Sequence, residues 1–265
     1  MNYKEICFQA IEIVEKTGAF IANERKNFSM SAVEHKGKAD LVSYVDKTAE
    51  RKLIDGLEQL ILESGFIAEE GTETKKGEQF NWIIDPLDGT TNFVHGVPPY
   101  AISVALTEGD EVVIGIVYEI TLDECFFSWK GAPAYLNGQV INVSKAKTHS
   151  EALVATGFPY TNFSQMDAYI ELMREVMEST QGIRRLGSAA TDLAYVAAGR
   201  YDAFWEYGLN AWDVAAGAFL VQQAGGKVSD FNGGGNYIFG REMVASNENY
   251  FNDFYQMVNQ YLGEK

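Results

Sequence analysis

Two aspartates at the end of an apolar run are the residues of this chain whose types and spacing best suit chemistry. Asp85 and Asp88 follow the run from Trp82 to Ile84, and Pro86 lies between them. Because proline cannot extend a β-ladder, the strand is predicted to stop at Pro86. Carboxylates presented at a chain reversal are oxygen ligands of the kind that Mg²⁺ prefers. The segment therefore indicates a site for a hard cation.

The same segment continues into a candidate site for an anion. Gly89 permits a tight turn, and Thr90 and Thr91 suit the first positions of a short helix. Free N–H groups at such a helix start suit a phosphate, so the whole segment indicates metal-assisted phosphate chemistry. The alternative is an ordinary turn, because Asp-Pro-x-Asp-Gly is also common turn sequence. The continuation Thr-Thr-Asn-Phe and the closing Pro98-Pro99 favour the site.

Three more acids fall where they could join this pair. Glu69 ends a short predicted strand, and Asp213 lies in the first turn of a predicted helix. Asp46 begins another predicted helix. Asp213 and Asp46 each have a structural alternative, because an acid in the first turn of a helix is commonly a dipole partner or a cap. Thr90 has the same alternative.

The phosphate chemistries that need their own sequence signature find none here. A covalent aspartyl-phosphate mechanism requires Asp-x-Asp directly after a strand, whereas the second acid of this chain comes three positions after the first. The chain has neither a Gly-x-Ser-x-Gly nucleophile elbow nor a P-loop. What remains is attack by a metal-activated water, which requires no protein nucleophile.

Composition and charge describe a globular, acidic protein. Of its 265 residues, 46% are hydrophobic and 13% aromatic, which is typical of a chain that buries a core. The 37 acidic residues exceed the 21 basic ones and give a formal charge of −16. This balance argues against nucleic acid or an anionic membrane as a partner, since both require a basic surface. An acidic protein that acts on a phosphate ester needs a metal to bridge the like charges.

Cysteines, histidines and hydropathy exclude further classes. Cys7 and Cys125 form no Cys-x-x-Cys motif, which favours a reduced, cytoplasmic protein with two free thiols. His35, His95 and His149 lie far apart and outside any zinc-ligand spacing. The N-terminus does not read as a signal peptide, and no stretch of 18 uncharged apolar residues predicts a membrane span.

The predicted elements place the acids at strand ends and helix starts. Helices are predicted over 3–25, 44–63, 165–179, 188–199 and 212–224, with a last helix that Asn247 can cap. Strands are predicted over 66–68, 82–84, 101–107, 112–118, 124–129, 152–156, 183–186, 202–206 and 242–245. The turn Glu108-Gly109-Asp110 predicts that the strands over 101–107 and 112–118 form a hairpin. Residues 27–41 lack periodicity and predict an exposed loop. We expect one domain, 1–265, with two sub-sheets over roughly 1–150 and 151–265.

Two motifs of this chain resemble the paired signatures of the inositol monophosphatase family. Asp-Pro-x-Asp-Gly-Thr-x-Asn-Phe appears as Asp85–Phe93, and Trp-Asp-x-Ala-Ala-Gly appears as Trp212–Gly217. Supporting matches are Asp40-Leu41-Val42-Ser43 with Asp46, Phe66–Gly71 and Arg185–Ala190. The matches fall in family order from about residue 36 to 226, and the chain has the length typical of the family.

The resemblance implies a fold and an activity. The expected fold is an α+β layered αβαβα sandwich of the inositol monophosphatase and fructose-1,6-bisphosphatase type. The expected activity is hydrolysis of the phosphate monoesters of small polyols with two to three Mg²⁺ ions, in a lithium-sensitive, cytoplasmic homodimer. The segment 29–41, with Lys36 and Lys38, is a candidate lid.

The resemblance also implies a role for each matching residue. The ligands of the first metal match Glu69, Asp85 and the main-chain carbonyl of Leu87, and those of the second match Asp85, Asp88 and Asp213; Glu69 also faces a weaker third metal. Catalytic groups match Glu69 and the pair that orients the attacking water, Thr90 backed by Asp46. The backbone of Gly89 and Thr90 matches the phosphate cradle, beside Asp88 and Asp213. The polyol-binding wall matches Gly187, Ser188, Ala189 and Glu206.

The sequence leaves the substrate open. The segment between Glu206 and Trp212, Tyr-Gly-Leu-Asn-Ala, departs from the family on the side that selects the substrate. Fructose 1,6-bisphosphate and the 2′-phosphate of NADP, which related proteins hydrolyse, are therefore alternatives to an inositol phosphate. Phosphatases of 3′-phosphoadenosine phosphate are usually longer and rank lower. A metal-dependent regulatory protein without catalysis is the alternative from another class, but such proteins usually lack a metal ligand, and this chain has each one.

Overall fold

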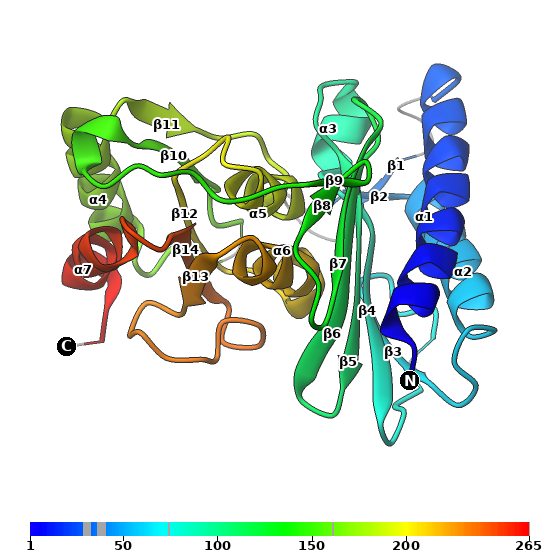
Figure 1. Ribbon diagram of the computed structural model, residues 1–265. Coiled ribbons are helices and arrows are strands. Elements are labelled where there is room, and N and C mark those ends of the chain that lie inside the picture. The colour runs from blue at the N-terminus through cyan, green and yellow to red at the C-terminus, as the bar shows by residue number, and fades with distance from the viewer. Residues whose placement is uncertain (29–32, 36–40, 74, 161, 265) are drawn as a thin grey trace.

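Helices and sheets alternate in five layers in the computed structural model, which describes residues 1–28, 33–35, 41–73, 75–160 and 162–264 (Figure 1). From one outer face to the other, the layers are α1 (Tyr3–Lys26) and α2 (Tyr44–Leu57), a seven-stranded sheet, α5 (Ala189–Ala197) and α6 (Ala211–Gln223), a five-stranded sheet, and α4 (Met166–Ser179) and α7 (Phe251–Leu262). This is the αβαβα order that the family resemblance implied.

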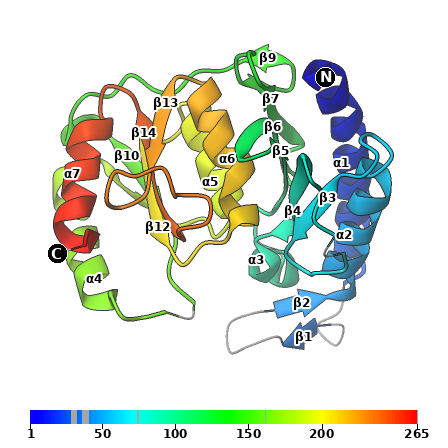
Figure 2. The same ribbon diagram turned by 90° about the horizontal axis from the view of Figure 1, so that it is seen from below.

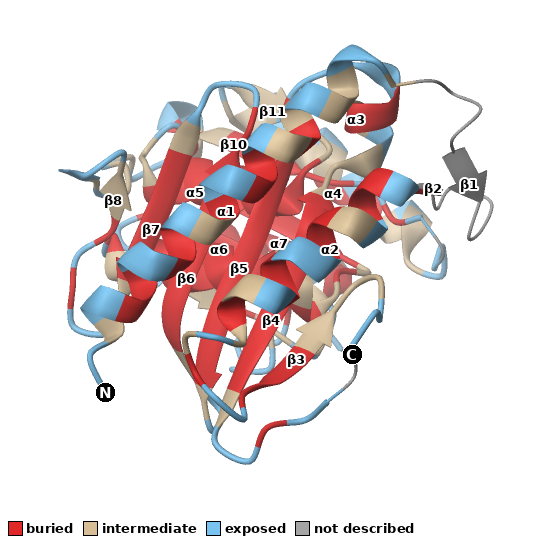
Figure 3. Cartoon of the chain, turned by 90° about the vertical axis from the view of Figure 1, so that its right-hand side faces the viewer, coloured by how far each residue is buried: buried red, intermediate tan, exposed pale blue. Residues whose placement is uncertain are grey.

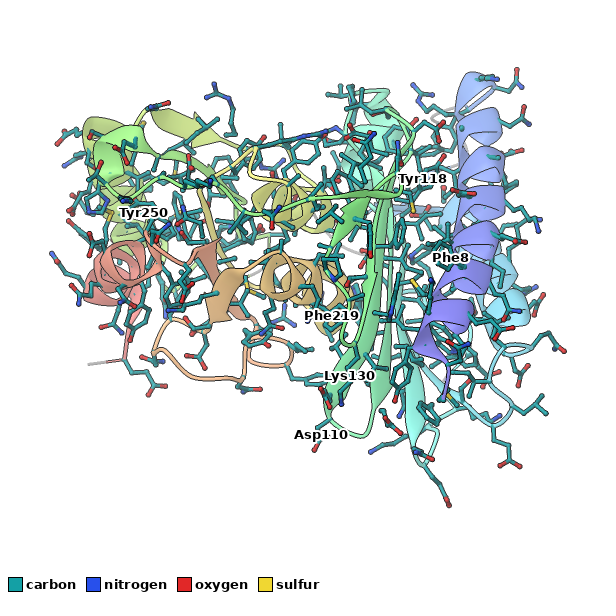
Figure 4. All side chains as sticks on the ribbon, in the orientation of Figure 1. Phe8, Asp110, Tyr118, Lys130, Phe219 and Tyr250 are labelled. Carbon is teal, nitrogen blue, oxygen red and sulfur yellow. The ribbon has the colours of Figure 1, made fainter. Side chains whose placement is uncertain are left out.

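The helices α1 and α2 cover the outer face of the seven-stranded sheet (Figure 3). The apolar residues of α1 recur at helical spacing and are buried, among them Ile6, Ala10 and Val14. Gly18 lets the ring of Tyr118 approach the helix, since a Cβ at Gly18 would lie 2.3 Å from the ring (Figure 4). The predicted amphipathic helix over 3–25 is thus confirmed.

Helix α2 is shorter than predicted. It ends at Leu57 instead of residue 63, and the chain then turns to enter β3 at Gly65. Ile61, whose apolar character suggested a longer helix, is still buried, so turn residues fill this part of the core. Glu63 adopts a positive φ of 66°, a conformation that no helix interior contains.

The seven-stranded sheet is antiparallel apart from its first pair. Its strands are β3 (Gly65–Ala68), β4 (Phe80–Asp88), β5 (Ala101–Glu108), β6 (Glu111–Glu119), β7 (Glu124–Trp129), β8 (Tyr135–Leu136) and β9 (Gln139–Val140), which pair in that order. β3 and β4 are parallel, and the predicted hairpin of β5 and β6 is confirmed. The short strands β8 and β9 were not predicted.

The sequence predicted that strand β4 would stop at Pro86, and this prediction is wrong. The strand continues to Asp88, and its register against β5 shifts between Asp85, which pairs with Ser103, and Asp88, which pairs with Ala101. A bulge leaves residues of one strand without ladder partners, so the missing N–H of proline costs nothing there. Both aspartates therefore belong to the end of one irregular strand.

The five-stranded sheet is mixed. Its order is β11 (Gly182–Arg184), β10 (Leu153–Thr156), β12 (Ala203–Tyr207), β14 (Glu242–Asn247) and β13 (Gly226–Ser229). β10 pairs in parallel with β11 and β12, whereas β14 is antiparallel to β12 and β13. β13 was missed because its Gly-Lys-Val-Ser sequence has little strand character. Ahead of α7, the Asn247 side chain accepts the N–H groups of Asn249 and Tyr250.

The segment predicted as a loop over 27–41 contains one strand and leads directly into a second. β1 (Val33–His35) and β2 (Leu41–Ser43) pair antiparallel, with Glu34 opposite Val42. The segment carries no alternating apolar pattern, so periodicity gave no strand signal. Lys36 and Lys38, proposed as lid residues, lie outside the described residues.

Helix α6 lies between the two sheets and is apolar around most of its circumference (Figure 2). Small residues let it approach the seven-stranded sheet closely: a Cβ at Gly115 of β6 would lie 2.9 Å from the carbonyl oxygen of Ala216 and 3.0 Å from the ring of Phe219 (Figure 4). Because α6 contacts strands of both sheets, we infer that 1–265 acts as one domain. The close packing also brings the start of α6 to the end of β4.

The predictions about the two cysteines and about membrane-spanning segments can be compared with the structure. Cys7 and Cys125 are buried, free thiols. Along the described ranges, no helix has both the length and the apolar character needed to cross a membrane.

Candidate active site

The predicted site residues meet at one cavity between the two sheets. They come from the ends of β3 and β4, the short helix α3 (Thr90–His95), the start of α5, the end of β12 and the start of α6. The cavity is lined by Glu69, Asp85, Leu87, Asp88, Gly89, Thr90, Gly187, Ser188, Ala189, Glu206 and Asp213. Asp46 does not line the cavity but contacts Thr90 from behind.

The turn between β4 and α3 is held in place by hydrogen bonds to the two aspartates. The N–H of Leu87 donates to Oδ1 of Asp85 at 2.9 Å. Oδ2 of Asp88 accepts from the Ser188 hydroxyl and from the N–H of Ala190, both at 2.7 Å. The two bonds of Asp88 join β4 to the start of α5, 100 and 102 residues later in the chain.

Gly89 makes the turn possible. Its φ of 89° lies in the left-handed region, where a side chain would be strained. A Cβ there would also lie 3.2 Å from the carbonyl oxygens of Gly187 and Pro99. The glycine therefore lets the segment of Gly187 pack directly against the first turn of α3.

Thr90 and Asp46 are joined across 44 residues of sequence. The Thr90 hydroxyl lies 3.1 Å from Oδ1 of Asp46 and 3.1 Å from the carbonyl oxygen of Leu87, and it can donate to either. Oδ2 of Asp46 accepts from the N–H of Ser43 at 2.9 Å and from its hydroxyl at 2.6 Å. Asp46 thus serves in a capping box for α2 and also contacts Thr90, so the two alternatives for this residue hold together.

Asp213 combines a cap and a cavity position in the same way. Its Oδ2 accepts the N–H of Asn210 at 2.6 Å in a capping box at the start of α6. The same carboxylate lines the cavity together with Asp88 and raises the pKa values of Glu69 and Asp85. The structural interpretation of Asp213 is therefore correct but incomplete.

The four acids predicted to bind metal oppose one another's ionisation. Burial, followed by the charges of Glu69, Asp88 and Asp213, holds the pKa of Asp85 well above its usual range. Burial raises the pKa of Asp88 to about 6, and burial together with Asp88 raises that of Asp213 to about 7. The pKa of Glu69 is also raised, by burial first and then by the charge of Asp213. A bound cation would relieve this repulsion.

The donor set has the chemistry of a site for a hard divalent cation. Four carboxylates and the Leu87 carbonyl offer only oxygen ligands, which suits Mg²⁺ better than zinc. In the ranges that the structure describes, no three His, Cys, Asp or Glu side chains already stand where they could hold a metal ion. One oxygen each of Asp85, Asp88 and Asp213 accepts the hydrogen bonds described above. The residues fit a cation once their side chains rearrange around it.

The residues predicted to face a polyol line the same cavity. Glu206 ends β12, is 7% exposed, and its pKa is raised well above the usual range by burial and then by Asp192. Gly157 makes room for this carboxylate, because a Cβ there would lie 2.0 Å from it. Ser188 caps α5 through the N–H of Thr191 at 3.3 Å.

Sequence reasoning missed several residues of the cavity. Arg185 and Asp192 line it beside Glu206, and Phe158 and Tyr160 lie at the same wall. Arg241 lines it near Asp213 and donates to the Asn210 side chain at 2.8 Å. Arg185 belongs to the supporting match Arg185–Ala190, which was the only sequence indication for any of these residues. Asp192 lies outside that match.

Comparison with known proteins identifies the family. The sequence profile described as the inositol monophosphatase family matches residues 2–262. The chain belongs to the inositol monophosphatase family. Its relatives include an inositol-1-monophosphatase of Rhizobium meliloti, 42% identical over 90% of both chains, and the Nus factor SuhB of Escherichia coli, 40% identical over 90% of both chains.

Solved structures of the family share this fold. The extragenic suppressor protein SuhB from Bartonella henselae superposes with a TM-score of 0.88 at 37% identity, covering 94% of this chain and 96% of that one. An IMPase from Thermotoga maritima gives 0.86 at 35% identity, covering 95% and 96%. Membership makes the protein a phosphoric monoester hydrolase of a family that is generally metal-dependent.

Proposed function

We propose that this protein uses Mg²⁺ and a water molecule to hydrolyse the phosphate monoester of a small polyol, such as an inositol monophosphate. The observation that carries the proposal is the meeting of buried Asp85 and partly buried Glu69, Asp88 and Asp213 with the Thr90–Asp46 pair at one cavity. These residues come from segments that are distant in sequence. A fold with only structural needs would not gather like charges in a partly buried cavity.

The proposed ligands follow from the oxygen donors of the cavity. Glu69, Asp85 and the carbonyl of Leu87 would hold a first Mg²⁺, and Asp85, Asp88 and Asp213 a second, with Glu69 facing a weaker third. When bound, Mg²⁺ supplies positive charge that lowers the pKa of water and neutralises the phosphate. Asp85 has the central place because it belongs to both sets.

The chain's own groups orient the reaction. In this mechanism the Thr90 hydroxyl donates its hydrogen bond to Asp46, which leaves the lone pairs of the Thr90 oxygen free to accept a hydrogen bond from the attacking water. Glu69 is the third catalytic group. The N–H groups of Gly89 and Thr90 bind the phosphate beside Asp88 and Asp213. Gly187, Ser188, Ala189 and Glu206 face the polyol.

A phosphate-release assay tests the activity. Inositol monophosphates, fructose 1,6-bisphosphate and NADP are each supplied with Mg²⁺, and we expect the highest kcat/KM for a polyol monophosphate. Excess EDTA should stop the reaction. Full turnover in EDTA would contradict the mechanism, and release only from fructose 1,6-bisphosphate or from NADP would contradict the substrate class.

A second role is suggested only by names. Relatives at 40% identity are named Nus factor SuhB, which keeps a regulatory function as the alternative. The complete set of acids favours the enzyme, since a protein without catalysis does not need them. We further propose that the protein is cytoplasmic and forms a homodimer. Sedimentation of the purified protein would test the homodimer.

Replacing Glu206 tests substrate choice separately from chemistry. Glu206→Ala should lower kcat/KM for the preferred polyol phosphate by roughly 10–150-fold, because each hydrogen bond to a charged group contributes roughly 1.5–3 kcal/mol. p-Nitrophenyl phosphate lacks those hydroxyls, so its hydrolysis should change little. Glu171→Ala, at an exposed residue of α4, is the control. Equal losses on both esters would assign Glu206 to the metals or the fold.

A further inference from the structure

Two buried carboxylates of the cavity accept no hydrogen bond from the part of the chain that the structure describes. Asp192 of α5 is 1% exposed and Glu206 of β12 is 7% exposed, and both line the cavity. Oδ1 of Asp192 is buried without a partner, and no described residue donates a hydrogen bond to either carboxylate. A buried acid without donors is costly, so a fold does not retain two of them for stability.

Arg185 lies beside both acids without closing on either. Its positive charge lowers the pKa of Asp192 and of Glu206, against the larger effect of burial. Among the described residues, no ion pair joins its guanidinium to these carboxylates, and its Nε is buried without a partner. A structural ion pair would instead place the charges in contact.

Aromatic side chains hold the guanidinium in this position. Its Nη2 donates to the Tyr160 hydroxyl at 2.6 Å, and its central carbon lies 5.2 Å from the centre of the Phe158 ring. Both contacts fix the plane of the group without using Nε. The cavity wall therefore presents one oriented donor beside two unpaired acceptors.

We propose that Asp192 and Arg185 extend the wall of Glu206 into a subsite that binds neighbouring uncharged hydroxyls of a polyol monophosphate and disfavours a second phosphate. A hydroxyl is both donor and acceptor, so it can donate to Asp192 while it accepts from Nε of Arg185. A second phosphate would be repelled by the carboxylates of Asp192 and Glu206, unless it bound together with a proton that neutralised one of the charges. This subsite rests on the proposed function and selects among its substrates.

Three variants test the subsite. Asp192→Asn removes the charge with little change of shape, and Arg185→Gln removes the donor; Arg184→Gln changes the exposed arginine next to it and is the control. Asp192→Asn and Arg185→Gln should each lower kcat/KM for inositol 1-phosphate by about 10–100-fold. Hydrolysis of p-nitrophenyl phosphate should stay within about threefold of wild type. Asp192→Asn should also narrow the preference for inositol 1-phosphate over fructose 1,6-bisphosphate, and Arg184→Gln should match wild type.

Other results would overturn the subsite. Equal losses on inositol 1-phosphate and p-nitrophenyl phosphate, or no loss on either, would show that Asp192 does not contact the polyol. Thermal unfolding adds a readout of structural roles: Asp192→Asn should keep or raise Tm, because it removes an unpaired buried charge, whereas a clear fall would assign Asp192 to the fold.

A binding measurement separates the subsite from the activity. Excess unphosphorylated myo-inositol should raise the Tm of wild type, and this shift should be lost in Asp192→Asn. A wild-type protein that hydrolyses none of the three esters would contradict the proposed function, and the inositol shift would then decide the subsite alone. No shift in wild type would overturn the subsite.

Discussion

Asp85→Asn should lower kcat/KM by about 10³-fold or more with every substrate. The charges of Glu69, Asp88 and Asp213 all raise the pKa of Asp85, and Asp85 is the one carboxylate assigned to both the first and the second Mg²⁺. Asparagine keeps the shape and one oxygen ligand, but it removes the negative charge and the second oxygen that the two cations would share. The lost charge stabilisation is on the order of 4 kcal/mol, which corresponds to about three decades of rate. Phosphate release at saturating Mg²⁺ measures it.

Thermal unfolding shows whether this loss comes from the metal or from the fold. In EDTA, Asp85→Asn should keep or raise Tm, since it removes a buried charge that its neighbours oppose. Mg²⁺ should raise the Tm of wild type and raise that of the variant much less, because ligand binding to the native state stabilises it. Asp110→Asn, at the exposed tip between β5 and β6 in Figure 4, is the control. A large fall of Tm in EDTA would assign Asp85 to the fold.

The layers of the fold follow from patterns that the sequence shows openly. Ile6, Ala10 and Val14 repeat at helical spacing, and the turn after Glu108 separates two apolar strands, because burial on one face leaves a periodic trace. The end of β4 could not be predicted in this way. Whether Pro86 stops a strand depends on the register of β5 against it, and that register is a tertiary property.

The site was predictable as far as local motifs reached. The segment that contains Asp85 and Asp88 combines a strand end with a helix start, and the structure places both acids at the cavity. Asp46 and Asp213 gave only a choice between cap and site, because sequence spacing does not show what packs against a cap. Both carboxylates turn out to cap a helix and to face the site residues from it.

Asp192 shows where sequence reasoning ends. It lies in α5, whose other residues are mostly apolar or small, and an isolated acid in such a helix gives no sign of what it faces. Its significance comes from the absence of a donor among the described residues and from Arg185 at the same wall. Both facts depend on how α5 packs beside β12.

Thr90→Ala should lower kcat by on the order of 10²–10⁴ while KM and Mg²⁺ binding stay near wild type, as for loss of a positioned proton-transfer group. The Thr90 hydroxyl contacts Asp46 and the carbonyl of Leu87, and neither bond is needed to fold α3, whose N-cap is Gly89. The Asp46 carboxylate keeps its bonds to Ser43, so the cap of α2 survives the change.

Two further variants make this prediction sharper. Thr148→Ala, at an exposed threonine that does not line the cavity, is the control and should leave kcat unchanged. Thr90→Ser keeps the hydroxyl and should recover most of the rate, which a role in packing of the Thr90 methyl group would not allow. If Thr90→Ala instead raises KM and leaves kcat intact, the Thr90 hydroxyl binds phosphate and does not orient the water. In that case Asp46 would be a cap of α2 that only supports Thr90, and Glu69 alone would remain as the group that directs the attacking water.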